Sequence, residues 1–286
     1  MTESSTSQTA RYRRVARTLA QADGLLIAAG AGMGVDSGLP DFRGTSGFWR
    51  AYPALGLAGL RFEQIASPHA FRADARLAWG FYGHRLQLYR RTVPHAGFAI
   101  LTAIAERLPR GAAVFTSNVD GQFQRAGFAA ETVAECHGSI HWLQCAGPCC
   151  SQIWPADELD PVVDEPNCRM QSDLPSCARC GELARPNILM FGDDAWLARR
   201  SDEQQRRLDI WMSRSPRLVT IELGAGTAIP TVRLFGEQAG GPLIRFNPTE
   251  PWVEPGRGEG FAVGALEGLR RLADALRESG FLDGQD

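Results

Sequence analysis

The sequence contains no lysine, so all 30 of its basic residues are arginine. We interpret this as the amino-acid bias of a GC-rich genome, because no other feature of the sequence explains it. An excess of charge is missing as well: 30 basic against 32 acidic residues give a formal net charge of -2. Proteins that hold nucleic acid through its phosphates carry a basic excess, so we expect no nucleic-acid partner.

Long hydrophobic runs are also absent. No stretch approaches the roughly 18 consecutive apolar residues that cross a membrane. The first ten residues, MTESSTSQTA, lack the basic start and apolar core of a secretory signal. We therefore expect no membrane partner and a cytoplasmic location, where the 7 cysteines are metal ligands or free thiols instead of disulfides.

Short apolar runs that alternate with helix-like segments predict an α/β fold. The runs lie at residues 25–29, 112–116, 218–223 and 243–246, and the helix-like segments at 11–22, 96–107 and 263–277. Such alternation indicates right-handed crossovers and a Rossmann-type parallel sheet. With 286 residues, 44% of them hydrophobic, the chain can bury one large domain with an insertion. We predict a disordered tail at 1–9 and a single domain at 10–286.

Two segments interrupt this alternation. Residues 38–62 are rich in glycine, proline and aromatic residues, which is typical of a long loop, and long loops in compact domains are often functional. Residues 145–185 hold most of the cysteines and show no long apolar period. This composition indicates a small zinc-binding module inserted at about 143–185.

The first apolar run ends in a glycine-rich turn. Gly30, Ala31 and Gly32 directly follow the strand predicted at 25–29. Glycines here allow a tight turn and a close approach of the backbone to a pyrophosphate. A purely structural turn is the plainer interpretation, but the position after a buried strand favours dinucleotide binding.

The longer segment GAGMGVDSGLPDFRG, at residues 30–44, resembles the cofactor-binding signature of the sirtuin family. The resemblance implies an NAD-dependent protein-lysine deacylase that acts on an acylated protein or peptide and releases nicotinamide and O-acyl-ADP-ribose. It implies an NAD site lined by Gly30, Ala31, Gly32, Asp41, Phe42 and Arg43, with Phe42 shielding the reactive ribose carbon. Gly34 departs from the signature, which often has serine there.

A second segment, at residues 116–127, resembles the sirtuin block whose asparagine and aspartate reach the nicotinamide and its ribose. The resemblance assigns Asn118 to catalysis, and Ser117, Asn118 and Asp120 to NAD binding. The Asp120 carboxylate can accept a hydrogen bond from the carboxamide of nicotinamide. Ser117 stands where the family has glutamine, and Phe123 where it has histidine.

His137 belongs to a third segment, Glu-Cys-His-Gly-Ser at 135–139, which resembles the block around the general base of sirtuins. Histidine suits this role because its unperturbed pKa of about 6.5 leaves it neutral and able to accept a proton. An isolated histidine would more simply be structural. The place of His137 between matching segments favours a catalytic role.

Cysteine spacing predicts one structural zinc site. Cys177 and Cys180 form a knuckle of two thiols three residues apart, while upstream Cys145, Cys149 and Cys150 offer three thiols for two places. We predict Cys145, Cys149, Cys177 and Cys180 as the ligands, because a Cys-x3-Cys spacing suits zinc and Cys145 follows the His-Gly segment as in sirtuins. Cys150 stays an alternative to Cys149.

Two later segments extend the resemblance. Residues 185–193 are similar to the sirtuin segment beside which the acyl peptide pairs as a strand, and this implies that Ile188 and Phe191 are walls of the acyl tunnel. Gly224, Gly226 and Asn247 follow predicted strands and match positions on the adenine side of NAD.

Tyr82 and Arg85 lie three residues apart on a probable helix, so both can face one pocket. The pair resembles the Tyr-x-x-Arg of sirtuins that prefer succinyl or malonyl groups, where it binds the distal carboxylate. A structural tyrosine beside a surface arginine is the plainer interpretation.

Two other functions stay open. The same NAD site could support NAD hydrolysis or ADP-ribose transfer to a protein. The chain could also be a non-catalytic NAD sensor, because fold alone does not determine function.

Overall fold

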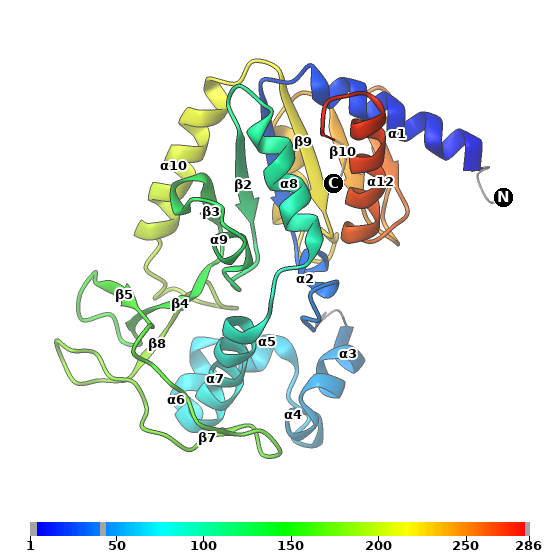
Figure 1. Cartoon of the computed structure of the whole chain (residues 1–286). Helices are drawn as coiled ribbons and strands as arrows, with labels where there is room; N and C mark the ends of the chain where they lie inside the picture. Colours follow the sequence, from blue (N-terminus) through cyan, green and yellow to red (C-terminus); the bar gives the residue numbers. More distant parts are fainter. Residues whose placement is uncertain (1–4, 41–43, 284–286) are drawn as a thin grey trace.

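The computed structural model describes residues 5–40 and 44–283. Its largest element is a six-stranded parallel sheet with the order β11-β10-β9-β1-β2-β3 (Figure 1). The strands are β1 (Gly24–Ala29), β2 (Ala112–Thr116), β3 (Val133–Glu135), β9 (Leu218–Leu223), β10 (Leu243–Phe246) and β11 (Gly258–Phe261). The predicted Rossmann-type sheet and its four predicted strands are confirmed, while β3 and β11 are short strands that the apolar pattern did not reveal.

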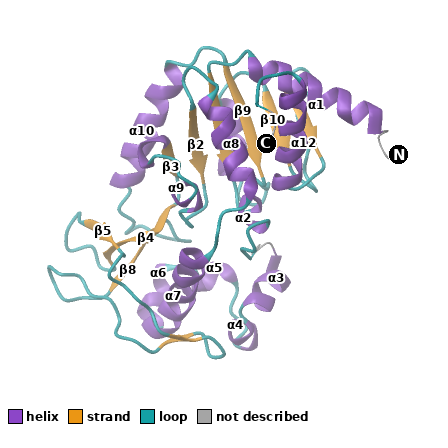
Figure 2. Cartoon of the chain, in the orientation of Figure 1, coloured by secondary structure: helices purple, strands orange, loops and turns teal. Residues whose placement is uncertain are grey.

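Both faces of this sheet are covered by helices, as Figure 2 shows. On one face, Leu25 and Ile27 of β1 pack with helices α1 (Ser5–Ala20), α8 (Ala96–Glu106) and α12 (Ala265–Glu278). On the other face, Leu26 and Ala28 pack with α10 (Arg199–Ser213) and α11 (Thr231–Gln238). Because alternate residues of β1 enter two different cores, every one of its residues is apolar or glycine.

Helix α1 begins earlier than predicted. It starts at Ser5, so the prediction of a disordered tail at 1–9 is wrong for residues 5–9. Helix α1 packs against α12, and Arg271 of α12 donates a hydrogen bond to the Gln8 side chain at 2.7 Å. Contacts between the two ends of the chain therefore support a helical turn that the polar local sequence did not indicate.

A second lobe lies beyond the carboxyl ends of the large sheet (Figure 1). It combines five helices with a three-stranded sheet of order β5-β4-β8 and a two-stranded ladder of β6 and β7. Its elements are α3 (Gly44–Ala51), α4 (Pro53–Leu57), α5 (Phe62–Ile65), α6 (Pro68–Ala73), α7 (Ala75–Arg91), β4 (Gly138–Cys145), β5 (Ile153–Pro155), β6 (Val163–Asp164), β7 (Arg169–Met170) and β8 (Ala184–Ile188). A separate apolar core, which includes Trp79 and Phe81, holds it together.

Residues 38–62 are not the long loop that we predicted, because they contain α3 and α4. Pro53 occupies the first turn of α4, where the N–H that proline lacks has no partner in a helix. Phe48 and Leu55 bury their side chains in the core of the second lobe. Tertiary packing thus makes helices of a segment whose proline and glycine content suggested a loop.

Three short elements complete the chain, and each stands at a turn of the large sheet. They are the helices α2 (Gly32–Val35) and α9 (Gln122–Arg125) and the 3-10 helix at Ala130–Thr132. Helices α2 and α9 follow the turns after β1 and β2, so they frame the segments that the sequence marks as functional.

Candidate active site

The glycine-rich turns after β1 and β9 meet where the strand order reverses. From β1 the chain moves outward to β2 and β3, and it later returns beside β1 at β9 before continuing to β10 and β11. Open parallel sheets bind ligands beyond the carboxyl ends of their strands at such a reversal. The topology therefore indicates a ligand site at the same edge of the sheet that carries the predicted cofactor-binding residues.

These two turns meet through backbone hydrogen bonds. Gly30 N donates to Leu223 O at 3.0 Å, and Gly32 N donates to Gly224 O at 3.1 Å. Gly224 has a φ of +59°, and a Cβ on it would lie 2.4 Å from the Gly32 Cα. The predicted residues Gly30, Ala31, Gly32, Gly224 and Gly226 thus carry no side chain larger than a methyl group, and this glycine surface fits the close approach of a pyrophosphate.

Asn247 lies beneath this surface and supports it. Its side chain is fully buried, Nδ2 donates to Ala225 O at 2.8 Å, and Oδ1 accepts from the N–H of Thr249 and of Glu250 at 3.0 Å each. All these bonds are internal, so Asn247 shapes the turn after β9. Glu250, which the sequence did not single out, accepts from the Thr227 N–H at 3.0 Å and from its hydroxyl at 2.6 Å.

The turn after β2 carries Ser117, Asn118 and Asp120. The Asn118 amide Nδ2 donates to Gly30 O at 3.0 Å, which joins this turn to the glycine surface. The Asp120 carboxylate is buried and accepts from the Gln122 N–H at 2.9 Å. Burial raises the pKa of Asp120 to about 6, although the Gln122 hydrogen bond and the Arg85 charge oppose this shift. Asp120 is therefore largely ionised at pH 7.

His137 leaves the sheet beside this turn. Strands β2 and β3 pair with Thr116 opposite Glu135, and Cys136 N donates to Thr116 O at 2.9 Å. Asn118 and His137 each follow their own strand by two residues, so they emerge at the same edge. Burial lowers the pKa of His137, which keeps the ring neutral at pH 7 and able to accept a proton.

Helix α10 fixes the end of β3 through Glu135. The buried Glu135 carboxylate accepts from Arg200 Nη2 at 2.5 Å, and the Glu135 N–H donates to Gln204 Oε1 at 3.1 Å. His137 follows two residues later, so this network sets where the candidate base leaves the sheet. Glu135 is not among the predicted site residues, although an acidic residue close to a candidate base in an apolar strand is an indication that the sequence offers.

Strand β8 continues into a segment that lies alongside His137. Leu189 N donates to His137 O at 2.9 Å, and Phe191 N donates to Ala66 O at 3.0 Å. Of the two predicted tunnel residues, Ile188 is buried in the second lobe, whereas Phe191 is 40% exposed and meets the Phe62 ring edge-on. Both stand near the candidate base, and only Phe191 offers a large accessible apolar surface.

Tyr82 and Arg85 lie together inside the second lobe on α7. Both are buried, and the Arg85 guanidinium lies 5.8 Å from the centre of the Tyr82 ring. Arg85 also donates to the Tyr89 hydroxyl, at 2.9 Å from Nε and 2.7 Å from Nη2. The arginine is thus not the surface residue of the plainer interpretation.

The four cysteines predicted as zinc ligands come together, with all their sulfur atoms within 4.8 Å of one another. The Sγ atoms of Cys145 and Cys180 are 3.7 Å apart, and so are those of Cys149 and Cys177. Zinc–thiolate bonds of about 2.3 Å at tetrahedral angles require nearly this spacing. Cys150 is not in this group, so the donor set fits zinc with Cys149 as the second ligand.

Three predicted NAD-binding residues, Asp41, Phe42 and Arg43, lie outside the described residues.

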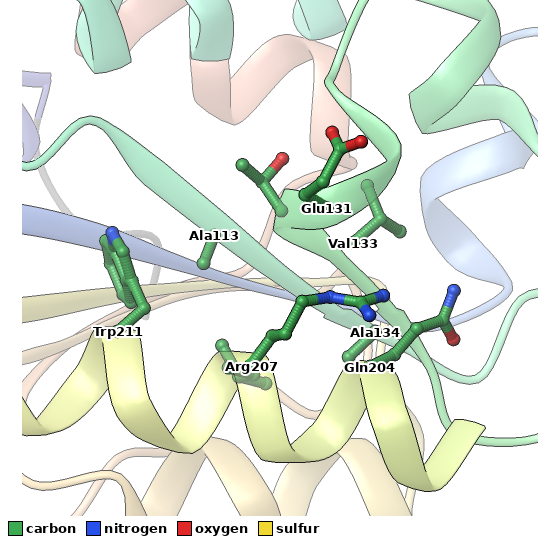
Figure 3. A pocket seen from close by; sticks show the side chains of 9 residues that line it. Ala113, Glu131, Val133, Ala134, Gln204, Arg207 and Trp211 are labelled. Carbon is green, nitrogen blue, oxygen red and sulfur yellow. The ribbon is translucent and has the colours of Figure 1, made fainter. Parts of the chain in front are cut away.

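A cavity of about 40 Å³ lies away from the glycine-rich turns, between α10 and the amino ends of β2 and β3, with Glu131, Arg207 and Trp211 around it (Figure 3). Because this volume suits one or two water molecules and the cavity stands at the opposite end of the strands, it is not the dinucleotide site.

Known proteins resemble this chain over most of its length. The model of the Sir2 family matches residues 30–212. The NAD-dependent protein deacylase of Thermococcus kodakarensis is 30% identical over 270 residues, which cover 92% of this chain and 96% of that protein. A solved Sir2 homologue in complex with ADP-ribose is 26% identical, covers 95% of this chain and 99% of its own, and superposes with a TM-score of 0.69. A Sir2 homologue bound to 2'-O-acetyl-ADP-ribose has the same identity and coverage and a TM-score of 0.66.

Proposed function

Because the chain belongs to the Sir2 family, we propose that it is an NAD-dependent protein deacylase. It takes an acyl group from a lysine side chain of a protein or peptide and transfers it to ADP-ribose, with release of nicotinamide and O-acyl-ADP-ribose. The observation that carries the proposal is that Gly30, Asn118 and His137 stand at one edge of the parallel sheet, two of them joined by a hydrogen bond. When bound, NAD supplies the anomeric carbon that receives the acyl oxygen as nicotinamide departs.

The residues of the edge divide this work by position. The backbone of the turns after β1 and β9 would hold the pyrophosphate of NAD, while Asn247 keeps the second turn in shape. Asp120 accepts a hydrogen bond from the nicotinamide carboxamide. Asn118 uses one amide hydrogen on Gly30 O, which leaves its carbonyl oxygen and its other hydrogen for the ribose. Each group is held by its own turn, which limits reorganisation during the reaction.

His137 is the general base. Its half-buried, neutral ring takes the proton of a ribose hydroxyl so that this oxygen can accept the acyl group. The network of Glu135, Arg200 and Gln204 holds the strand from which the ring emerges. Protonation below its lowered pKa removes this capacity, so acyl transfer requires a pH at which the ring is neutral.

The acyl peptide pairs with the segment that follows β8. Peptide-binding segments of this kind use backbone hydrogen bonds, which tolerate many side chains. Phe191 offers an exposed apolar ring for the acyl-lysine stem, and Ile188 lies behind it. The zinc held by the four cysteines is structural, since four thiolates leave no open position for a substrate.

The acyl group that we favour carries a carboxylate, as succinyl and malonyl groups do. Support comes from Tyr82 and Arg85, which share one side of α7 with the arginine charge held in an aromatic surrounding. An arginine fork in such a surrounding binds carboxylates well because little water competes with it.

We place the enzyme in the cytoplasm, consistent with the reduced thiols that a zinc site requires. Within the described part of the chain, no helix combines the length and apolar character needed to cross a membrane.

A single assay separates this function from its alternatives. Nicotinamide release from NAD is measured with acetyl-, succinyl- or malonyl-lysine peptide and without peptide. Release that depends on peptide and yields O-acyl-ADP-ribose supports the deacylase. Release without peptide would indicate an NAD hydrolase, and binding of NAD without release would indicate a sensor.

A further inference from the structure

Strand β4 leaves its partner β8 for three residues shortly after His137. The two strands pair at Ser139 with Asn187 and then at Leu143 with Pro186, so residues 140–142 of β4 bulge out of the ladder. Bulges next to functional sites redirect side chains that a regular strand would point elsewhere. Here the bulge turns β4 toward the segment that carries Asn118 and Asp120.

Two hydrogen bonds join this bulge to the turn after β2. Ile140 N donates to Val119 O at 3.0 Å, and the His141 Nε2 lies 2.9 Å from Asp120 O. A carbonyl oxygen only accepts, so Nε2 of His141 carries the hydrogen. Both the neutral and the protonated ring keep this donor, and the bond is therefore insensitive to the titration of His141.

The His141 ring also packs against Gly121. A Cβ on Gly121 would lie 2.8 Å from the Cδ2 and 2.9 Å from the Nε2 of His141, and Gly121 has a φ of +71°. Because Gly121 has no side chain, the His141 ring can occupy the space beside it. Hydrogen bond and ring contact together determine the orientation of the peptide that links Asp120 to Gly121.

We propose that His141 is a positioning residue, which holds the Asp120 carboxylate where it receives the carboxamide of nicotinamide. This inference rests on the proposed function of Asp120. His141 touches neither cofactor nor acyl group in this role. It acts through the backbone of Asp120.

If His141 positions Asp120, its loss should affect only those ligands that contain nicotinamide. ADP-ribose contains the pyrophosphate and both riboses but lacks nicotinamide. Loss of the His141 hydrogen bond should therefore weaken NAD and nicotinamide and leave ADP-ribose almost unchanged. A hydrogen bond of net strength about 1 kcal/mol corresponds to about a fivefold change in affinity.

The test compares three variants of the full chain with its zinc bound. His141→Phe keeps a ring and loses the donor, His141→Gln keeps a donor at about the same distance, and His141→Met has the length of glutamine without a donor. His69→Phe, at an exposed position on α6, is the matched control. Calorimetry gives the dissociation constants of NAD and ADP-ribose, and the peptide assay gives the inhibition constant of nicotinamide.

We expect His141→Phe and His141→Met to weaken NAD and nicotinamide about fivefold, with ADP-ribose within twofold. His141→Gln and His69→Phe should bind all three ligands as the unchanged chain does. In an Asp120→Asn background, His141→Phe should add little, because residues that act through one another are not additive.

Equal weakening of NAD and ADP-ribose would overturn the proposal, since it would show general loss of structure. Unchanged NAD affinity in His141→Phe, or a full effect in the Asp120→Asn background, would overturn it as well. If His141→Phe does not fold, the comparison of His141→Gln with His141→Met tests the proposal by the same criteria. The dissociation constants of NAD and ADP-ribose do not require turnover, so absence of peptide-dependent nicotinamide release would refute the proposed function and leave the inference separately testable.

Discussion

Arg185 of β8 and Asp193 form a fully buried ion pair with two parallel hydrogen bonds of 2.8 Å. Asp193 also accepts from the N–H of Met190 and of Ala195, at 3.3 and 3.1 Å. Together these bonds close the segment between them into one loop, which carries Phe191. The proposed peptide-binding segment therefore takes its shape from a charge pair that is closed to solvent.

Removal of one partner of this pair should be costly. We expect Arg185→Met or Asp193→Asn to lower the free energy of unfolding by about 3–5 kcal/mol, because the remaining group is left buried without its partner. Urea unfolding measures this change. Glu278→Gln breaks the exposed pair with Arg13 and should cost less than about 1 kcal/mol. An Asp193→Asn variant as stable as that control would refute the assignment of the pair as structural.

His137→Ala should abolish acyl transfer and leave NAD affinity within a few-fold, because the ring acts as a base and contributes little to ground-state binding. The peptide assay and calorimetry measure the two quantities on the same preparation. In the unchanged chain, activity should fall on acidification as the His137 ring becomes protonated. Because burial lowers the pKa of His137, this fall should occur at a lower pH than the pKa of an ordinary histidine predicts. Turnover like that of the unchanged chain in His137→Ala would remove His137 from catalysis.

The zinc site should hold about one metal ion per chain. We expect Cys177→Ser or Cys180→Ser to lose both zinc and stability, since metal binding and folding of such a module are linked. Cys150→Ser is the matched control, because Cys150 lies outside the group of four sulfur atoms and its loss should leave the metal content unchanged. Metal analysis with thermal unfolding reports both effects, and loss of zinc in Cys150→Ser would show that Cys149 was the wrong choice.

Arg85→Met should reduce the preference for succinyl- or malonyl-lysine over acetyl-lysine by about ten- to a hundredfold, the value of a charge-assisted pair. The ratio of kcat/KM for the two peptides measures it. Tyr89→Phe removes a hydrogen-bond partner of Arg85 without changing its charge, so it should keep the preference. A preference for acetyl-lysine in the unchanged enzyme would instead make Arg85 a structural residue of α7.

The ionised carboxylate of Asp120 should lower the free energy of unfolding, although the proposed function requires it. Its folded pKa of about 6 is raised above the ordinary 3.8, so the stability that it contributes is present below 3.8 and is lost as the pH rises through 6. Asp120→Asn keeps an acceptor for the Gln122 N–H and cannot ionise. We expect it to raise the free energy of unfolding at pH 8 by up to about 3 kcal/mol, with a smaller gain at pH 5, while NAD binding weakens.

Denaturant unfolding at the two pH values checks this, with NAD affinity measured in parallel. An Asp120→Asn variant that is less stable than the unchanged chain at pH 8 would show that burial of the ionised carboxylate carries no such cost.

The sequence predicted those features that depend on local pattern. The apolar runs at 25–29 and 218–223 identified two central strands because both faces of each are covered. Cysteine spacing reduced the zinc ligands to two choices. Only the distances between sulfur atoms could decide between Cys149 and Cys150, since adjacent residues in an irregular turn have no preferred direction that spacing reveals.

The remaining features depend on tertiary contacts. His141 gave no indication of its role, because that role arises from a bulge in β4 and from a glycine twenty residues earlier in the chain. Helix α3 depends on the packing of Phe48 into the second lobe. Asn247 matched a cofactor position in the family pattern, yet its amide is used inside the protein, which a one-dimensional match cannot show.

The order of the strands also determines when the large sheet can form during synthesis. β1 has β2 on one side and β9 on the other, and β9 begins only at Leu218. Until the ribosome has released that residue, one edge of the central strand has no partner, and long-range pairing of this kind is slow. A nascent or truncated chain that ends before β9 exposes an apolar strand edge of the type that aggregates. The central strand thus gains its second neighbour only when β9 has been synthesised, and the outer edge of β9 stays open until β10 follows.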